Sequence, residues 1–300
     1  HDYERLRTEC GSAYAGLKAC LQREWRHTDA TEQFSRPDKG FNRLKQCRHG
    51  LMLYNPLDWY IGRSLEVYGE WGEKKVQLWE HLVQPGQVAL EIGAHVGTLT
   101  LPLSRLVGSG RVIAFEPFYP SFAALAANTA LNSLDNVELR QAVVADRAGK
   151  VFMDRGSLAF KQQDFFNYGS IDFQGLDILP ADAERQVAWD EYPVVTLDGL
   201  SMSQVDFIKI DAEGLELAVL RGARRLLRKS RPLLFVEYRS PKQKDPRLLH
   251  FLRKAGYECV LLRLPVFNER NFRNHPEDLW GSLVSFDLLC RNTRRDTEGK

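Results

Sequence analysis

The residues of this chain with the clearest chemical potential are two glycines and a glutamate that follows them by roughly 20 positions. Gly93 and Gly97 come directly after the apolar run Val88–Leu90, and without side chains they let backbone N–H groups approach a ligand. Glu116 follows a second apolar run, Arg111–Phe115. A carboxylate at such a strand end can accept hydrogen bonds from both hydroxyls of a ribose. The spacing predicts a nucleoside-binding crevice.

The glycine loop reads G-A-H-V-G, which differs from the G-x-G-x-x-G of dinucleotide-binding loops. A nicotinamide cofactor is therefore disfavoured. Two glycines at this spacing also occur in ordinary strand-to-helix turns, so the loop alone would not distinguish binding from structure. The glutamate at the next strand end favours binding.

A second group of acids stands far downstream, in the segment VDFIKIDAEGLE (Val205–Glu216). Asp211 and Glu213 directly follow a run rich in β-branched and aromatic residues, which predicts a strand. Ligands of open α/β sheets bind outside the carboxyl ends of strands, so we expect both acids to face the same crevice as Gly93. The alternative is that they cap a helix starting near Leu215, where carboxylates are favourable.

The elements that must position these residues alternate between strand and helix. The pattern predicts helices over Thr98–Val107, Leu217–Lys229 and Pro246–Ala255, and strands over Val88–Leu90, Arg111–Phe115, Leu233–Tyr238, Tyr257–Leu262 and Leu283–Arg291. This order predicts an α/β fold: a mostly parallel seven-stranded sheet with an antiparallel edge pair and helices on both faces.

Two segments depart from that alternation. Tyr3–Trp25 carries small and apolar residues on one helical stripe, which would pack on its own domain or form a homodimer seam. The polar stretch from 28 to 48 is typical of a linker. We therefore expect an N-terminal helix and linker over 1–48 and one catalytic domain over 49–300. Within that domain, residues from about 151 to 195 form an insertion covering the strand ends.

Composition narrows the partners and the compartment. The chain has 300 residues, with 41 Lys and Arg against 39 Asp and Glu, and this balance gives no reason to expect nucleic acid. The five cysteines are scattered without a C-x-x-C pair, as expected for reduced thiols in the cytoplasm. We find neither a membrane span nor a signal peptide. His1 in place of Met suggests that upstream sequence is missing.

Several segments in the same order resemble the FkbM family of S-adenosylmethionine-dependent methyltransferases. They are GEW (Gly69–Trp71), QPGQVALEIGAHVG (Gln84–Gly97), VIAFEP (Val112–Pro117), Asn128 with Asn132, VVTLDGL (Val194–Leu200), DFIKIDAEGLE (Asp206–Glu216), VLRGA (Val219–Ala223) and LLFVEY (Leu233–Tyr238). The resemblance covers roughly residues 50 to 290. Family members usually carry Asp where Glu91 stands and Asn where His95 stands.

The resemblance implies a class I methyltransferase (Rossmann-like) fold that binds S-adenosylmethionine across the strand ends. Glu91 and Gly93 would lie against the amino acid part of this donor, and Glu116 would bind its ribose. Gly97, the second glycine of the loop, is also expected to be a cofactor-binding residue. Asp146 would neighbour the adenine, although D-R-A-G around it is equally typical of a turn.

The donor's methyl group is electrophilic, so a hydroxyl acceptor chiefly needs alignment and loss of its proton. Asp211 or Glu213 suits that task, and crowding among acids would raise the pKa of such a base. Alternatively, Asp198, Asp211 and Glu213 could ligate a divalent cation. The resemblance does not imply a metal, and none is predicted.

The predicted function is O-methylation of a small molecule or a glycan in biosynthesis. The alternative is a non-catalytic scaffold that retains the nucleoside crevice. Five aromatic residues of the insertion would form a wall for a sugar or polyketide-like acceptor: Phe160, Phe165, Phe166, Tyr168 and Phe173. Five further residues are weaker candidates for contact with the donor or acceptor: Tyr68, Glu70, Trp71, His275 and Trp280.

Overall fold

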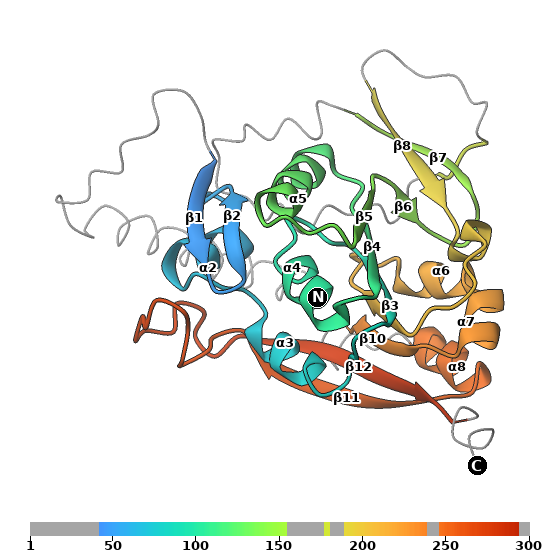
Figure 1. Cartoon of the computed structure of the whole chain (residues 1–300). Helices are drawn as coiled ribbons and strands as arrows, with labels where there is room; N and C mark the ends of the chain where they lie inside the picture. The colour runs from blue at the N-terminus through green and yellow to red at the C-terminus, as the bar shows by residue number, and fades with distance from the viewer. Residues whose placement is uncertain (1–41, 155–176, 181–188, 239–245, 294–300) are drawn as a thin grey trace, which may run out of the picture. The chain divides into compact units, whose positions relative to one another are not determined.

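The computed structural model describes residues 42–154, 177–180, 189–238 and 246–293 (Figure 1). The chain divides into two units, 1–41 and 42–300, and every element described below belongs to the second. The helix predicted over Tyr3–Trp25 and the five aromatic residues of the insertion lie outside the described residues.

A seven-stranded sheet forms the centre of the second unit, in the order β11-β12-β10-β9-β3-β4-β5. Its strands are Val88–Ile92 (β3), Arg111–Phe115 (β4), Val137–Arg140 (β5), Phe207–Ile210 (β9), Leu233–Glu237 (β10), Tyr257–Pro265 (β11) and Val284–Asn292 (β12). Neighbours from β10 to β5 are parallel, whereas β12 is antiparallel to both β10 and β11. The mixed sheet with its helices is the class I methyltransferase-like arrangement that the resemblance implied.

The helices form two layers because the buried strands alternate their apolar side chains between two cores. On β3, Leu90 and Ile92 pack into the core shared with one group of helices, while Ala89 packs into the other core. The first group is Glu216–Arg221 (α6), Arg224–Ser230 (α7) and Pro246–Lys254 (α8). The second is Glu73–Trp79 (α3), Thr100–Val107 (α4) and Tyr119–Leu131 (α5). A further helix, Ile61–Val67 (α2), and a 3-10 turn, Leu197–Leu200 (η1), lie in the connections.

The stretch predicted as a linker contains a strand, so that prediction is wrong for its last residues. Arg43–Cys47 (β1) pairs antiparallel with Gly50–Tyr54 (β2), inside the unit that begins at 42. The hairpin is held by α5: Asn132 Oδ1 accepts the Leu51 N–H at 3.0 Å, and its Nδ2 donates to Leu51 O at 2.7 Å. Partners 81 positions apart leave no local signal in the polar segment itself.

The helix predicted over Leu217–Lys229 is two helices, α6 and α7, separated at Gly222. A Cβ atom at Gly222 would lie 2.0 Å from the carbonyl oxygen of Ala145. Ala145 directly follows the first strand of a separate three-stranded sheet, whose strand order is β6-β8-β7. Its strands are Val143–Val144 (β6), Gly149–Asp154 (β7) and Trp189–Val195 (β8). The ends of the predicted insertion are thus an antiparallel pair, β7 with β8.

The expectation that the cysteines are reduced is wrong for one pair. Cys259 and Cys290 stand opposite each other on β11 and β12 and form a disulfide. A scattered spacing in sequence gave no sign of it, because strand pairing brings the two together across 31 positions. Cys47 is free and buried. Among the described residues, no helix has the length and apolar character needed to cross a bilayer.

Candidate active site at the carboxyl ends of the central strands

Four adjacent parallel strands each end at or next to an acidic residue. Glu91 lies on β3, Glu116 follows β4, Asp211 follows β9, and Glu237 ends β10. All four line one cavity of about 300 Å³. A smaller cavity of about 50 Å³ adjoins it, and both are lined by Gly93, His95, Glu116, Asp211 and Glu213. The structure therefore brings the two acidic segments of the sequence to one place.

Gly93 lets the end of β3 approach the end of β9. Its φ is +79°, and a Cβ atom there would lie 1.8 Å from the carbonyl oxygen of Asp211. No side chain fits in that space. The glycine lets the loop after β3 and the acidic segment after β9 come into direct backbone contact.

Glu91 is fully buried and only partly satisfied. Its Oε2 accepts the Thr100 hydroxyl at 2.6 Å. Its Oε1 has no hydrogen-bond partner among the described residues and lies 3.9 Å from Lys209 Nζ. Burial raises the pKa of Glu91 to about 7, against the opposing pull of Lys209. A buried oxygen without a hydrogen bond is costly, so this carboxylate is suited to a ligand donor group.

Glu116 is held by the backbone on both sides. Its Oε2 accepts the N–H of His95 at 2.8 Å, and its Oε1 accepts the N–H of Phe118 at 3.0 Å. Each oxygen keeps a further lone pair for a ligand. Burial raises the pKa of Glu116 to about 7, although both backbone hydrogen bonds oppose this shift.

Lys209 connects the glycine loop to the acidic segment. It stands on β9, and its Nζ donates to Gly93 O at 2.6 Å while lying 3.5 Å from Asp211 Oδ2. Burial alone would raise the pKa of Asp211, but Lys209 and then Lys75 outweigh it and hold that pKa below its usual value. The expectation of a raised pKa at Asp211 is therefore wrong: this carboxylate is ionised.

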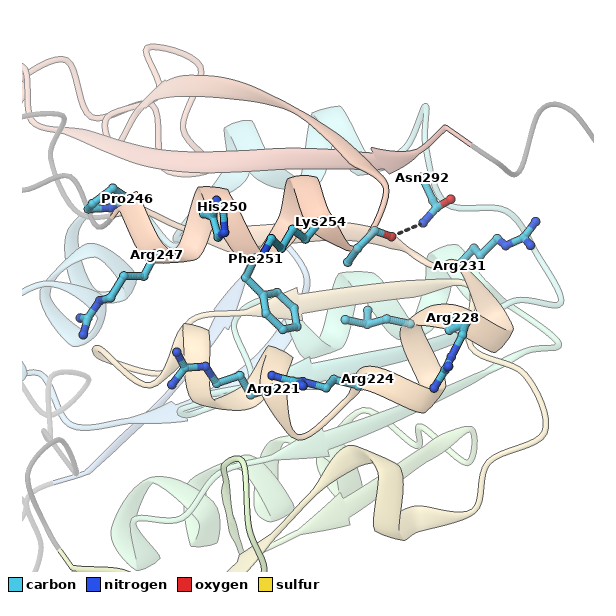
Figure 2. Close-up of a pocket in the computed structure, with 12 residues that line it drawn as sticks. Arg221, Arg224, Arg228, Arg231, Pro246, Arg247, His250, Phe251, Lys254 and Asn292 are labelled. Atoms are coloured by element: carbon cyan, nitrogen blue, oxygen red, sulfur yellow. Dashed lines mark hydrogen bonds between the residues drawn. The ribbon is translucent and has the colours of Figure 1, made fainter.

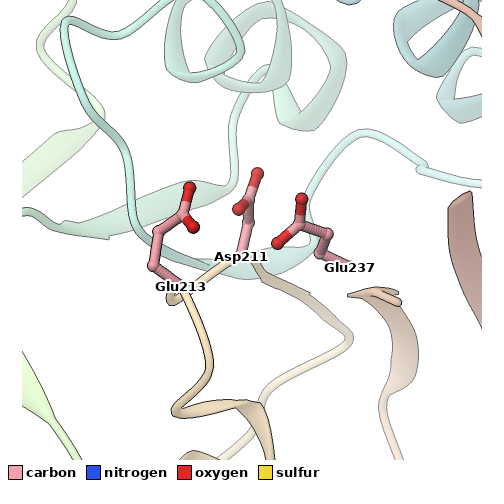
Figure 3. Close-up of side chains that lie close together, drawn as sticks. All are labelled: Asp211, Glu213 and Glu237. Atoms are coloured by element: carbon pink, nitrogen blue, oxygen red, sulfur yellow. The ribbon is translucent and has the colours of Figure 1, made fainter. Parts of the chain in front are cut away.

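Glu237 is a site residue that the sequence reasoning missed. Its neighbour Val236 pairs with Ile210 in the parallel register, which brings Glu237 beside Asp211 (Figure 3). The charge of Asp211 and then burial raise the pKa of Glu237 well above its usual value. The signal was present in LLFVEY, where an acid ends a buried strand. Crowding among the acids therefore raises the pKa of Glu237 and not that of Asp211.

Carboxylate oxygens of Asp211, Glu213 and Glu237 lie within 4.8 Å of one another, and Figure 3 shows the three side chains next to one another. Oxygen ligands of this kind suit a hard divalent cation, but Lys209 already supplies positive charge at Asp211. Asp198, the third ligand of the predicted alternative, is not in this cluster. Its carboxylate accepts the N–H groups of Arg225 and Leu226, both at 2.9 Å, at the start of α7.

The acid that caps the backbone before α6 is Glu216. Glu216 Oε1 accepts the N–H groups of Ala212 at 3.1 Å and Gly214 at 3.0 Å. Glu216 thus satisfies the backbone before α6 with its own side chain. Asp211 is left to face the cavity.

His95 is a buried histidine inside the cavity. Neither ring nitrogen has a hydrogen-bond partner among the described residues, and Nε2 lies 3.8 Å from Asp58 Oδ2. Burial and then Lys209 lower the pKa of His95 to about 4, so the ring is neutral at physiological pH. Its φ of 50° is unusual for a residue with a side chain.

The remaining predicted residues divide between cavity and scaffold. Trp71 lines the larger cavity. Gly97 does not line either cavity: a Cβ there would meet Leu125 of α5 at 2.8 Å. Asp146 is exposed and lies outside both cavities, which agrees with the turn interpretation.

Four weaker candidates serve the scaffold. Glu70 accepts hydrogen bonds from Asn268 and from the Phe272 N–H, both at 2.8 Å. The Tyr68 hydroxyl donates to Glu277 O at 2.9 Å, and the rings of Tyr68 and His275 meet edge to face. Trp280 Nε1 donates to Ser64 at 3.2 Å. None of these four lines the cavities.

Comparison with known proteins gives one family. The model of the methyltransferase FkbM domain matches residues 91–259, which is more than half of the chain and spans β3 through the first part of β11. No match was found among curated proteins.

Solved structures similar to the chain include several methyltransferases. The methyltransferase FkbM of Methylobacillus flagellatus KT is 16% identical, with a TM-score of 0.42 over 77% of this chain and 60% of that one. The O-methyltransferase of Bacillus cereus in complex with SAH is 16% identical, with a TM-score of 0.42 over 73% and 81%. Precorrin-6y C5,15-methyltransferase of Geobacter metallireducens GS-15 is 14% identical, with a TM-score of 0.40 over 73% and 87%.

Proposed function

Because this chain belongs to the FkbM methyltransferase family, we propose that it is an S-adenosylmethionine-dependent O-methyltransferase that acts on a hydroxyl of a small molecule or glycan. The observation that carries the proposal is the convergence of Glu91, Glu116 and Asp211 on one cavity. They come from three neighbouring strand ends, where ligands of open α/β sheets bind.

The cavity residues fit the donor. Glu91 Oε1 is a buried acceptor to which no described residue donates a hydrogen bond, and it suits the donor's ammonium group. Glu116 is fixed by two backbone N–H groups and can accept both ribose hydroxyls. The smaller cavity adds the apolar residues Phe115, Val143 and Val144, which suit a flat adenine ring. Asp146 is not needed in this arrangement.

The donor supplies an electrophilic methyl group, so the protein must position the acceptor and remove its proton. Asp211 is the base that the geometry favours, because Lys209 and Lys75 keep it ionised. Glu237, whose pKa is raised, stands beside it and keeps its own proton, so Asp211 is the member of the pair that takes up the acceptor's proton. Glu213 lines the same space and can orient the acceptor hydroxyl. The proposed reaction needs no metal, since the lysines supply the positive charge.

The acceptor would lie against the aromatic and apolar lining residues of the larger cavity. They include Tyr60, Trp71, Leu264 and Val266. Aromatic and apolar side chains suit one face of a sugar or a polyketide-like ring. The insertion's aromatic residues lie outside the described residues, so the wall expected of them stays a prediction.

Two measurements test the proposal. Calorimetry with S-adenosylmethionine and with S-adenosylhomocysteine should show binding of both, and absence of both would end it. A screen with isotopically labelled donor against hydroxylated metabolites and envelope sugars should then identify an acceptor. Binding without transfer to any acceptor, in a protein with intact Asp211, would favour the non-catalytic scaffold.

The compartment remains a separate matter. We expected the cytoplasm, but disulfides such as Cys259–Cys290 persist mainly in oxidising environments. Thiol labelling of the protein, isolated from its source under rapid acid quench, would show whether Cys259 and Cys290 are paired or reduced there.

A further inference from the structure

A second concave surface lies away from the carboxyl ends of the strands, between helices of the layer that α6, α7 and α8 form. This basic groove has a cavity volume of about 940 Å³ and is lined by residues of α6, α7, α8 and the end of β12 (Figure 2). Pockets that bind small molecules have volumes of roughly 300 to 1,000 Å³. The groove is therefore large enough for a ligand of its own, and it shares no lining residue with the candidate active site.

The groove is strongly cationic. Its permanently charged lining residues are Arg221, Arg224, Arg228, Arg231, Arg247 and Lys254. No acidic residue lines it among those that the structure describes. The whole chain carries a formal net charge of only +2, so this is a local concentration and not a general basicity. Like charges that face one another across a cavity repel unless an anion lies between them.

Three cations of the groove, one on each of its helices, have no side-chain partner among the described residues. Among the described residues, the side chains of Arg221, Arg228 and Lys254 take part in no hydrogen bond or ion pair. By contrast, Arg225, which does not line the groove, donates to Asp198 O at 2.9 Å. Acids are thus available to this layer, but the groove side is left without them.

Helix ends do not account for the arrangement. Arg228 and Lys254 stand in the last turns of α7 and α8, where cations are favourable. Arg224 and Arg247 stand in the first turns of the same helices, where a cation is unfavourable. Their positions need another explanation, and an anion in the groove provides one.

The lining of the groove also includes apolar residues. They are Leu227, Phe251 and Ala255, and Arg224 Cζ lies 5.7 Å from the centroid of the Phe251 ring. Figure 2 shows Phe251 between the cations of α8 and those of α6 and α7. Arginine forks match phosphate oxygens in pairs, whereas apolar lining residues accommodate an organic body.

We propose that the basic groove binds a small molecule that carries two or more phosphate groups. One phosphate would neutralise only part of the charge, and several phosphates would engage the cations of both α7 and α8. This inference goes beyond the proposed methyl transfer and does not depend on it.

Tripolyphosphate is the first probe, with calorimetry at low ionic strength and orthophosphate as the single-phosphate comparison. The test variant is Arg228→Glu with Lys254→Glu, one reversal on each wall. Its matched control is Lys229→Glu with Arg253→Glu, which reverses the next charge on each helix outside the groove. We expect the test variant to bind tripolyphosphate at least about tenfold more weakly than the wild type, and the control to bind within about twofold of it.

Three results would overturn the proposal. Tripolyphosphate could bind no more tightly than orthophosphate at equal ionic strength. The control variant could lose as much affinity as the test variant, which would indicate diffuse charge attraction. A single-stranded oligonucleotide could bind in the groove and resist displacement by tripolyphosphate, which would assign the groove to a polymer. Circular dichroism checks that both variants remain folded.

Discussion

At the residue scale, burial and two lysines set the pKa values of the acids in the candidate site and so determine which of them are protonated. Glu91 and Glu116 are buried with raised pKa values, Asp211 is kept ionised by Lys209, and Glu237 takes up the raised pKa of the crowded pair. Residue types and spacing predicted that acids would meet here. They could not predict which acid keeps its proton, because that depends on contacts across the sheet.

Asp211→Asn should separate binding from chemistry. Asparagine keeps the shape but cannot accept the acceptor's proton, so we expect transfer to fall by about 100-fold or more. Donor affinity should stay within a few-fold. Turnover with labelled donor and calorimetry measure the two effects. Asp198→Asn is the matched control, since Asp198 lies on η1 outside the cavity and its carboxylate accepts N–H groups at the start of α7. Undiminished turnover in the Asp211 variant would remove it from the mechanism.

Glu116→Gln tests the raised pKa through the stability of the ligand-free protein. Because the folded pKa is about 7 against an ordinary 4.5, folded Glu116 binds more protons than unfolded Glu116 across that interval. Wild-type stability therefore falls as pH rises from about 4.5 to 7, by on the order of 3 kcal/mol for this group. Glutamine does not titrate.

The melting temperature of the Glu116 variant relative to wild type should consequently rise between pH 5 and pH 8 at constant ionic strength. Groups that do not interact with Glu116 titrate equally in both proteins and cancel in the difference. A difference that stays flat with pH would mean that Glu116 has an ordinary pKa.

At the scale of elements, the predicted strands and helices largely agree with the structure. β4 matches its prediction, and α8 ends within one residue of it. The pattern failed where long-range contacts decide: at the hairpin held by Asn132, and at Gly222, where a backbone contact divides one apolar pattern into two helices. Local periodicity carries no information about such contacts.

Gly93→Ala should affect both the loop and the segment after β9. The added methyl group would stand 1.8 Å from Asp211 O, and the positive φ adds strain. We expect loss of donor binding and a lower melting temperature. Gly86→Ala serves as the comparison at a positive φ of 87°, since its Cβ would meet nothing closer than 3.9 Å. Equal losses in both variants would mean that backbone conformation, and not the close approach, is the cause.

At the scale of the whole molecule, the sequence indicated one catalytic domain with a buried sheet, and the family comparison supports that domain over 91–259. The near-zero net charge concealed a basic groove, because a sum over the chain says nothing about where the charges lie. The scattered cysteines likewise concealed a pairing that only the strand register brings about.

The edge of the sheet should depend on that disulfide. In the entropic model, closing a loop across 31 positions lowers the conformational entropy of the unfolded chain. This raises the free energy of unfolding by about 3 to 4 kcal/mol. Cys259→Ser with Cys290→Ser should therefore lower the melting temperature by several degrees, and dithiothreitol should do the same to wild type. A wild-type melting temperature that dithiothreitol leaves unchanged would contradict this expectation, provided that mass spectrometry confirms reduction of the disulfide.

Gly222 joins two parts of the molecule that otherwise have separate tasks. The backbone at Ala145 rests where any side chain at 222 would stand, so the small three-stranded sheet touches the corner between α6 and α7. The basic groove is built partly on that same corner. A displacement of the backbone at Ala145 would consequently press on the corner next to Arg221 and Arg224, two of the groove's arginines.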